Sequence, residues 1–228
     1  MYCLFFPVDP QVQKAEPRYY SLVAPFRQEG ITIKLTARDV KLVEYASTKR
    51  VYKAKLHSKL FGDSPRRVVC KCATGPQIKS LLHEATVYQS KLTDLQGVYV
   101  PRYVGIFHGE HPDGYDVAIM VLEDGGQAIK YMLKYTPLYF RQRVVGALLK
   151  IHHAGVVHND FTDRHIIAKK LADLNPERPW YPMIVDFGEA RVDHDCPYKD
   201  NKVETYIRVP ARADFKCAEL YVACRDTA

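Results

Sequence analysis

The sequence is poor in the features that mark non-globular and membrane proteins. Glycine and proline number only 12 and 14 in 228 residues, which excludes collagen-like and low-complexity chains. No apolar run approaches the ~18 residues of a membrane span, and the first residues lack the basic segment and apolar stretch of a signal peptide. We therefore expect an intracellular protein, cytoplasmic or nuclear, that is not bound to a membrane.

Cysteine is scarce as well. The chain has 6 cysteines, and with 47% hydrophobic residues it can build a core without disulfide bonds. Cys70 and Cys72 flank a lysine in an apolar run, with no second pair of cysteines nearby. We therefore expect reduced thiols and no zinc site at this pair.

Neither sign of charge dominates strongly. Lys plus Arg number 33 against 26 Asp plus Glu, which gives a formal net charge of +7. Such an excess favours phosphorylated or polyanionic partners, although scattered basic pairs are more often a solvated face. The interleaved aromatic and basic residues of a nucleic-acid surface are missing, so nucleic acid is not an expected partner.

The first 122 residues predict an arm followed by five strands and one helix. Residues 1–30 hold four prolines and no sustained period, so we interpret them as an N-terminal extension. Apolar residues from Ile78 to Leu92 recur at helical spacing and predict a helix. Runs rich in Val, Tyr and Ile predict strands at 40–45, 50–56, 67–73, 98–107 and 117–122.

The remaining residues predict a second, smaller part. The turn-rich stretch Glu123-Asp124-Gly125-Gly126 indicates a hinge. A helix is predicted from Thr136-Pro137 to about Gly155, where a glycine can end it. A polar loop at 158–164 and short apolar strands at 166–168 and 183–185 follow, and no internal repeat is visible.

Four charged residues stand at informative places in this layout. Lys71 lies in a predicted strand, Glu84 on the predicted helix, Asp160 in the polar loop, and Asp186 opens an Asp-Phe-Gly turn after a short strand. Each has an ordinary explanation alone, such as an edge charge, a solvated carboxylate or a loop cap. Their order along the chain makes a joint role the better interpretation.

That order resembles the core of the protein-kinase superfamily from about Val40 to Gly188. The stretches Leu82-His-Glu-Ala-Thr-Val-Tyr and Leu95-Gln-Gly-Val-Tyr-Val-Pro-Arg-Tyr-Val-Gly are similar to the fungal-type kinase-like proteins in particular. The resemblance implies an α+β, bilobal, protein-kinase-like fold. Its N-lobe would be a five-stranded antiparallel sheet with one helix, and its C-lobe would be short and mainly helical. The domains would be an extension at 1–30, the N-lobe at 31–122 and the reduced C-lobe at 123–228.

The resemblance also implies roles for the four charged residues. Lys71 would hold the α- and β-phosphates of ATP and pair with Glu84, because phosphoryl transfer depends on positioning and charge neutralisation. Asp160 would orient the acceptor hydroxyl and take its proton, and Asp186 would bind Mg²⁺ through carboxylate oxygen.

Two further positions are implied less directly. The backbone from Glu123 to Gly125 would meet the edge of adenine. Arg164, four residues after Asp160, would either neutralise the transferring phosphate or pair with a nearby surface carboxylate, Asp163 or Asp173.

The chain departs from the kinase pattern in three places. The glycine-loop positions hold Glu44, Ala46 and Lys49, and side chains there keep the backbone from approaching phosphate closely, although Lys49 could compensate in part. His165 stands where a metal-binding asparagine is expected, and imidazole suits Mn²⁺ or other transition metals better than Mg²⁺. The C-terminal part is short and lacks an Ala-Pro-Glu motif.

Three functional interpretations stay open from the sequence. The first is an ATP-dependent phosphotransferase, similar to a small atypical Ser/Thr protein kinase, that uses Mg²⁺ or Mn²⁺ and acts on a protein or a small-molecule hydroxyl. The second is a pseudokinase that serves as a nucleotide- or partner-binding scaffold, which the missing glycines and His165 favour. The third is a basic nucleic-acid-binding domain with chance kinase motifs.

Overall fold

The computed structural model describes residues 1–10, 18–24, 32–45, 49–171, 175–198 and 211–227. The chain divides into two compact units, and each is described by itself. Unit 1 comprises residues 1–85 and 103–124, and unit 2 comprises residues 86–102 and 125–228.

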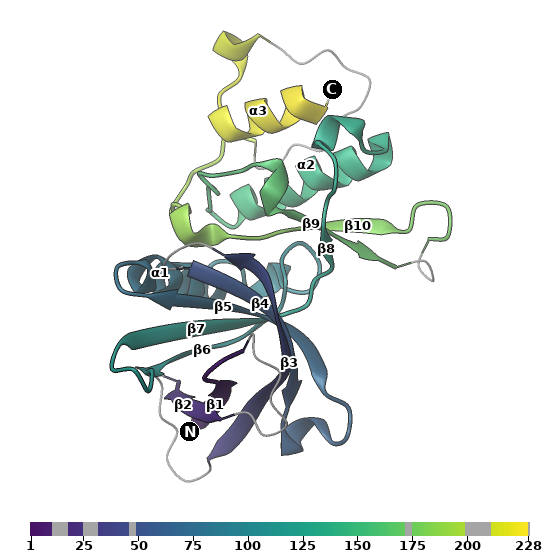
Figure 1. The fold of residues 1–228 in the computed structure, drawn as a ribbon. Coiled ribbons are helices and arrows are strands. Elements are labelled where there is room, and N and C mark those ends of the chain that lie inside the picture. Colours follow the sequence, from purple (N-terminus) through teal and green to yellow (C-terminus); the bar gives the residue numbers. More distant parts are fainter. Residues whose placement is uncertain (11–17, 25–31, 46–48, 172–174, 199–210, 228) are drawn as a thin grey trace. The chain divides into compact units, whose positions relative to one another are not determined.

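Unit 1 is a closed seven-stranded barrel with the order β1-β2-β6-β7-β5-β4-β3 (Figure 1). Neighbouring strands are antiparallel except β1 and β3, which pair in parallel and close the barrel. The strands are β1 (Tyr2–Pro7), β2 (Tyr19–Val23), β3 (Ile33–Tyr45), β4 (Lys49–His57), β5 (Arg66–Thr74), β6 (Tyr103–Glu110) and β7 (Asp116–Glu123).

The period of two in each strand fills the barrel interior. Successive side chains of a strand face opposite sides of the sheet, so every second residue can be apolar and buried. Leu4 of β1 lies opposite Leu22 of β2 and Leu35 of β3, and all three are buried. The same cluster contains Phe6, Ala37, Tyr52, Ala54, Leu56, Val68, Cys70, Phe107, Val117, Ile119 and Val121.

This architecture corrects the expected fold class. The α+β, bilobal, protein-kinase-like fold with a five-stranded antiparallel N-lobe is wrong, because the sheet has seven strands, mixed pairing and a closed barrel. The two extra strands come from residues 1–30, expected as an extension. Their prolines obscured a short alternation, since Pro7 lies at the end of β1 and leaves Leu4 and Phe6 free to face inward.

Most of the individual strands predicted within unit 1 are present in the structure. The strands expected at 40–45, 50–56, 67–73 and 117–122 are confirmed within β3, β4, β5 and β7. The strand expected from Val98 begins only at Tyr103. Instead, Val98, Tyr99 and Val100 donate backbone hydrogen bonds to the Leu95 carbonyl and form a tight loop, with Gly97 at a positive φ of 82°.

The predicted helix from Ile78 is α1 (Gln77–Ser90), and its residues divide between the two units at Ala85. In unit 2 the helices are α2 (Leu138–His153), as predicted, and α3 (Ala218–Thr227). A three-stranded sheet has the order β10-β9-β8, so unit 2 is less helical than expected. Its strands are β8 (Gln127–Ala128), β9 (Ile166–Lys170) and β10 (Trp180–Ile184).

Short 3₁₀ turns connect these elements. In unit 1 there is η1 (Lys59–Phe61). In unit 2, Phe187 begins the turn η5 (Phe187–Glu189). Its side chain is fully buried and packs edge-on against Tyr88, with ring centroids 5.6 Å apart. No helix in the described ranges is long and apolar enough to cross a bilayer. The 3₁₀ turns of unit 2 are η2 (Thr93–Leu95), η3 (Leu133–Tyr135), η4 (Asp163–His165), η5 (Phe187–Glu189) and η6 (Arg212–Asp214).

The barrel closure makes a prediction about β1. Replacing Leu4 by Ala should destabilise the protein by about 2–5 kcal/mol, because it leaves a cavity where β1, β2 and β3 meet. Tyr2→Ala, at the exposed first residue of the same strand, is the matched control and should cost far less. Urea unfolding followed by circular dichroism measures both. Equal, small effects would show that β1 is not part of the folded barrel.

Candidate functional site

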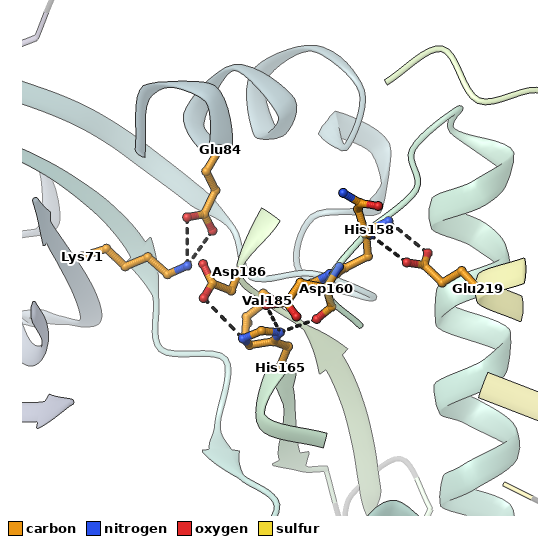
Figure 2. Close-up of polar contacts among 9 residues, drawn as sticks. Lys71, Glu84, His158, Asp160, His165, Val185, Asp186 and Glu219 are labelled. Atoms are coloured by element: carbon orange, nitrogen blue, oxygen red, sulfur yellow. Dashed lines mark hydrogen bonds and ion pairs between the residues drawn. The ribbon is translucent and has the colours of Figure 1, made fainter. Parts of the chain in front are cut away.

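Lys71 and Glu84 form a buried ion pair in unit 1 (Figure 2). Cys70 faces the barrel interior, so Lys71, next along β5, faces the outer surface, where α1 supplies Glu84. The Lys71 ammonium donates to both carboxylate oxygens, at 2.6 and 2.9 Å. The side chains are only 7% and 1% exposed. The structure thus brings together the two residues for which the resemblance implied a pair.

Burial makes each of these charges depend on the other. An isolated charge in a protein interior is strongly disfavoured, whereas a close pair with good geometry recovers most of that cost. Removing one partner from such a pair typically costs about 3–5 kcal/mol. The pair therefore fixes the position of α1 against β5 within unit 1.

In unit 2, the loop before Asp160 is held by a buried histidine. The Nε2–H of His158 donates to the Val185 carbonyl at 2.9 Å, and the Asp160 backbone N–H donates to His158 Nδ1 at 3.4 Å. These two contacts require the neutral ring, with hydrogen on Nε2 and a lone pair on Nδ1. Burial lowers the pKa of His158, which agrees with the neutral form. His158 therefore joins the Asp160 loop to the strand that precedes Asp186.

His165 lies between Asp160 and Asp186 (Figure 2). Its Nδ1 is 2.7 Å from the backbone carbonyl oxygen of Asp160, and its Nε2 is 3.4 Å from Asp186 Oδ2. A carbonyl oxygen only accepts, so Nδ1 carries a hydrogen. In the neutral ring, Nε2 then presents a lone pair toward a carboxylate, and two acceptors face each other.

A cation between these two atoms would satisfy both acceptors. It can be a proton, which makes His165 an imidazolium, or a metal ion bound by both atoms. Metal–ligand bonds of about 2.0–2.2 Å place neighbouring ligand atoms of one ion about 3.0–3.4 Å apart. The separation of 3.4 Å between Nε2 and Oδ2 fits that geometry. The hydrogen bond from Nδ1 to a carbonyl is also the usual second contact of a metal-binding histidine.

Backbone strain marks the same loops. Asn159 and Asp186 both have positive φ values, 66° and 73°, in the left-handed region that non-glycine residues rarely adopt. Such conformations cost of order 1–3 kcal/mol each and persist where surrounding contacts enforce them. Here they turn the backbone immediately before Asp160 and at Asp186.

Glu219 at the start of α3 supplies those contacts at Asn159. Its carboxylate accepts the backbone N–H group of His158 at 3.0 Å (Figure 2) and that of Asn159 at 2.7 Å. It also lies 2.7 Å from His152 Nε2. Burial alone raises the pKa of Glu219, but these hydrogen bonds outweigh it and hold the pKa below its ordinary value. An ionised carboxylate therefore fixes the loop that carries Asp160.

The remaining predicted site residues lie elsewhere in the two units. Glu123 ends β7 in unit 1 and forms an ion pair with Arg66 at 3.4 Å. Gly125 is buried in unit 2, and a Cβ there would lie 2.7 Å from Ile167 Cδ1, so the close packing requires glycine. Lys49 begins β4, half-buried, and Ala46 lies outside the described residues.

Arg164 is exposed on η4 and forms no ion pair with a described residue. Of the two surface partners considered for it, Asp163 instead accepts the backbone N–H of Leu133 at 3.2 Å. Asp173 lies outside the described residues. The structure therefore does not form the pair with Asp163, and the pair with Asp173 stays a prediction.

Glu219 and a cluster of histidines and cysteines in unit 2 were not predicted from the sequence. Four possible metal-ligand atoms lie within 4.8 Å of one another there, one each from His152, His194, Cys196 and Cys217. The pair His194-Asp-Cys196 was the local signal, but its partners lie far away along the chain. Comparison with models of known protein families and with curated protein sequences found no match for this chain.

The buried pair makes the second prediction. Lys71→Met should lower the free energy of unfolding by about 3–5 kcal/mol, because it leaves the buried Glu84 carboxylate without the Lys71 ammonium. Adding Glu84→Gln should restore part of that loss, since no buried charge then remains. Urea unfolding of the two single variants and the double variant gives the coupling energy. Additive effects would contradict a direct interaction between the two side chains.

Proposed function

We propose that the chain is an ATP-dependent phosphotransferase that moves the γ-phosphate to a hydroxyl group with the help of a divalent metal ion. The observation that carries this proposal is the arrangement around His165 in unit 2, which directs a ring nitrogen and the Asp186 carboxylate at one point beside the Asp160 loop. The order of the charged motifs, which resembles a protein-kinase core, supports it. The proposal does not rest on the fold, since function belongs to sites rather than folds.

Asp186 and His165 would hold the metal ion, whose chemistry is to neutralise charge on the phosphate oxygens. The Asp186 side chain is 25% exposed and that of His165 is 12% exposed, so neither side chain is fully closed off from solvent. A mixed nitrogen and oxygen pair favours Mn²⁺ over Mg²⁺, because Mg²⁺ prefers oxygen ligands.

Asp160 would act on the acceptor. Its side chain is 46% exposed, so a hydroxyl group from a substrate can donate a hydrogen bond to it. The acceptor oxygen forms a bond to the γ-phosphorus as the bond to the β-phosphate oxygen breaks, and the hydroxyl proton passes to the Asp160 carboxylate. ADP leaves with the electron pair of the broken bond.

The remaining parts of the proposal come from the resemblance. Lys71 would bind phosphate, and Arg164, exposed on the same short turn as His165, would neutralise the transferring group. The acceptor would be a protein Ser/Thr side chain or a small-molecule hydroxyl, and the location would be cytoplasmic or nuclear. The alternative is a scaffold that binds nucleotide without turning it over, and the replaced glycine-loop residue Glu44 favours it.

Nucleotide and metal binding should appear as a thermal shift. Ligand at ~100 times its Kd stabilises a protein by about 2.7 kcal/mol, which raises the melting temperature of a chain of this size by about 5–11 °C. We expect ATP with Mn²⁺ to give this shift in the wild type and not in Asp186→Asn or Lys71→Ala. Transfer of labelled γ-phosphate to the chain itself or to casein should be lost in Asp160→Asn, while the thermal shift remains.

Each outcome of this experiment separates the interpretations. Equal transfer by wild type and Asp160→Asn would contradict the role of Asp160. A metal-dependent shift without any transfer would favour the nucleotide-binding scaffold. A protein that is folded by circular dichroism but shows no thermal shift with ATP and Mn²⁺ or with ATP and Mg²⁺ would contradict both the phosphotransferase and the nucleotide-binding scaffold. A partner-binding module would then remain.

The metal ligands make a separate prediction. His165→Asn should move the metal preference from Mn²⁺ toward Mg²⁺, because an amide oxygen replaces an imidazole nitrogen. Thermal shift with ATP across a series of concentrations of each metal gives the ratio of the two apparent affinities. An unchanged ratio would place His165 outside the metal's ligands and leave the proton as the cation between it and Asp186.

A further inference from the structure

Four potential metal ligands meet in unit 2 away from the residues assigned above. They come from three segments: His152 ends α2, His194 and Cys196 lie in the loop after η5, and Cys217 precedes α3. One ligand atom from each lies within 4.8 Å of every other. His152, Cys196 and Cys217 are buried and His194 is half-buried. Water therefore has little access to the space that the four atoms surround.

The distances suit a tetrahedral ion. His152 Nδ1 lies 3.6 Å from Cys217 Sγ, and His194 Nε2 lies 3.9 Å from the same sulfur atom. Zinc bonds of about 2.3 Å to sulfur and about 2.0–2.1 Å to nitrogen place neighbouring ligand atoms about 3.5 Å apart in a tetrahedron. The cysteines are free thiols in the structure, so no disulfide competes for the sulfur atoms.

The second ring nitrogen of His152 contacts a carboxylate, as it commonly does in a metal-binding histidine. Its Nε2 lies 2.7 Å from Glu219 Oε2, and a carboxylate oxygen in this position accepts a hydrogen from Nε2. In the neutral ring, Nδ1 then has its lone pair directed toward the cysteines. A carboxylate, a histidine and a metal in line are a recurring arrangement that fixes both the tautomer and the orientation of the ring.

We propose that His152, His194, Cys196 and Cys217 bind one Zn²⁺ ion. Two thiolates and two imidazoles in a tetrahedron are the donor set that zinc prefers among the common divalent metals. Because the protein fills all four positions, the ion is structural and does not take part in chemistry. It connects the end of α2, the 194–196 loop and the start of α3, and through His152 it positions Glu219.

This inference is independent of the proposed phosphotransferase. None of the four ligands is assigned a role in nucleotide binding or transfer, and a scaffold without activity would need the site equally. Glu219 provides the only named connection, since it accepts hydrogen bonds from His152 and from the backbone of His158 and Asn159.

Metal content of the full chain tests the site directly. Protein purified without chelator from zinc-supplemented cells should contain about one Zn²⁺ per chain, measured by plasma mass spectrometry. The Cys196→Ser, Cys217→Ser double variant should lose at least tenfold of that content. Cys224→Ser, a half-buried cysteine of α3 outside the cluster, is the matched control and should keep its zinc. Replacement by Co²⁺ should give the intense visible bands of a tetrahedral ion and a thiolate charge-transfer band.

A measurement on the wild type covers the case in which the double variant fails to fold. Alkylation of the native protein, read by peptide mass spectrometry, should spare Cys196 and Cys217 when zinc is bound and modify them after treatment with a chelator. The proposal is overturned by folded wild type without zinc, by full zinc content in the double variant, by equal alkylation with and without chelator, or by a disulfide between these two cysteines.

Discussion

Unit 2 depends on one partly buried carboxylate, that of Glu219. Three donors converge on it: a histidine ring from α2 and two successive backbone N–H groups from the loop that leads to Asp160. Because these hydrogen bonds outweigh the effect of burial, the pKa of Glu219 stays low and the group remains an anion. An anion among three donors can hold the positive-φ backbone of Asn159, which would otherwise relax.

Unit 1 also contains a paired charge, but here the carboxylate of Glu84 pairs with the ammonium of Lys71. Its interior is apolar, and the one described pair of buried opposite charges, Lys71 and Glu84, lies on the outer side of β5 rather than in the core. There the strand and α1 meet through a contact whose two members cannot be lost singly without leaving a buried charge. In both units a paired charge joins one element to its neighbour.

Local patterns predicted most elements of the fold, but not how they join. Runs rich in Val, Tyr and Ile identified β4, β5 and β7, and helical spacing identified α1 and α2. The barrel escaped prediction because its closure depends on pairing between β1 and β3, for which the sequence carries no local signal. Prolines around two short strands also concealed their alternation, and the kinase-like resemblance supplied a five-stranded sheet in its place.

The candidate site was predictable where its residues belong to short motifs and not where they converge from distant segments. Lys71, Asp160 and Asp186 each lie in a recognisable local context, whereas Glu219 and the cysteine–histidine cluster become visible only once α2 and α3 are packed.

The two proposed metal positions of unit 2 differ in the number of ligands that the protein supplies. Four protein ligands from distant segments leave no open position, which suits an ion that stabilises packing. Two ligands beside the half-exposed Asp160 leave positions for substrate oxygens, which suits an ion that takes part in chemistry. Glu219 joins the two, because it orients a ligand of the closed site and holds the loop of the open one.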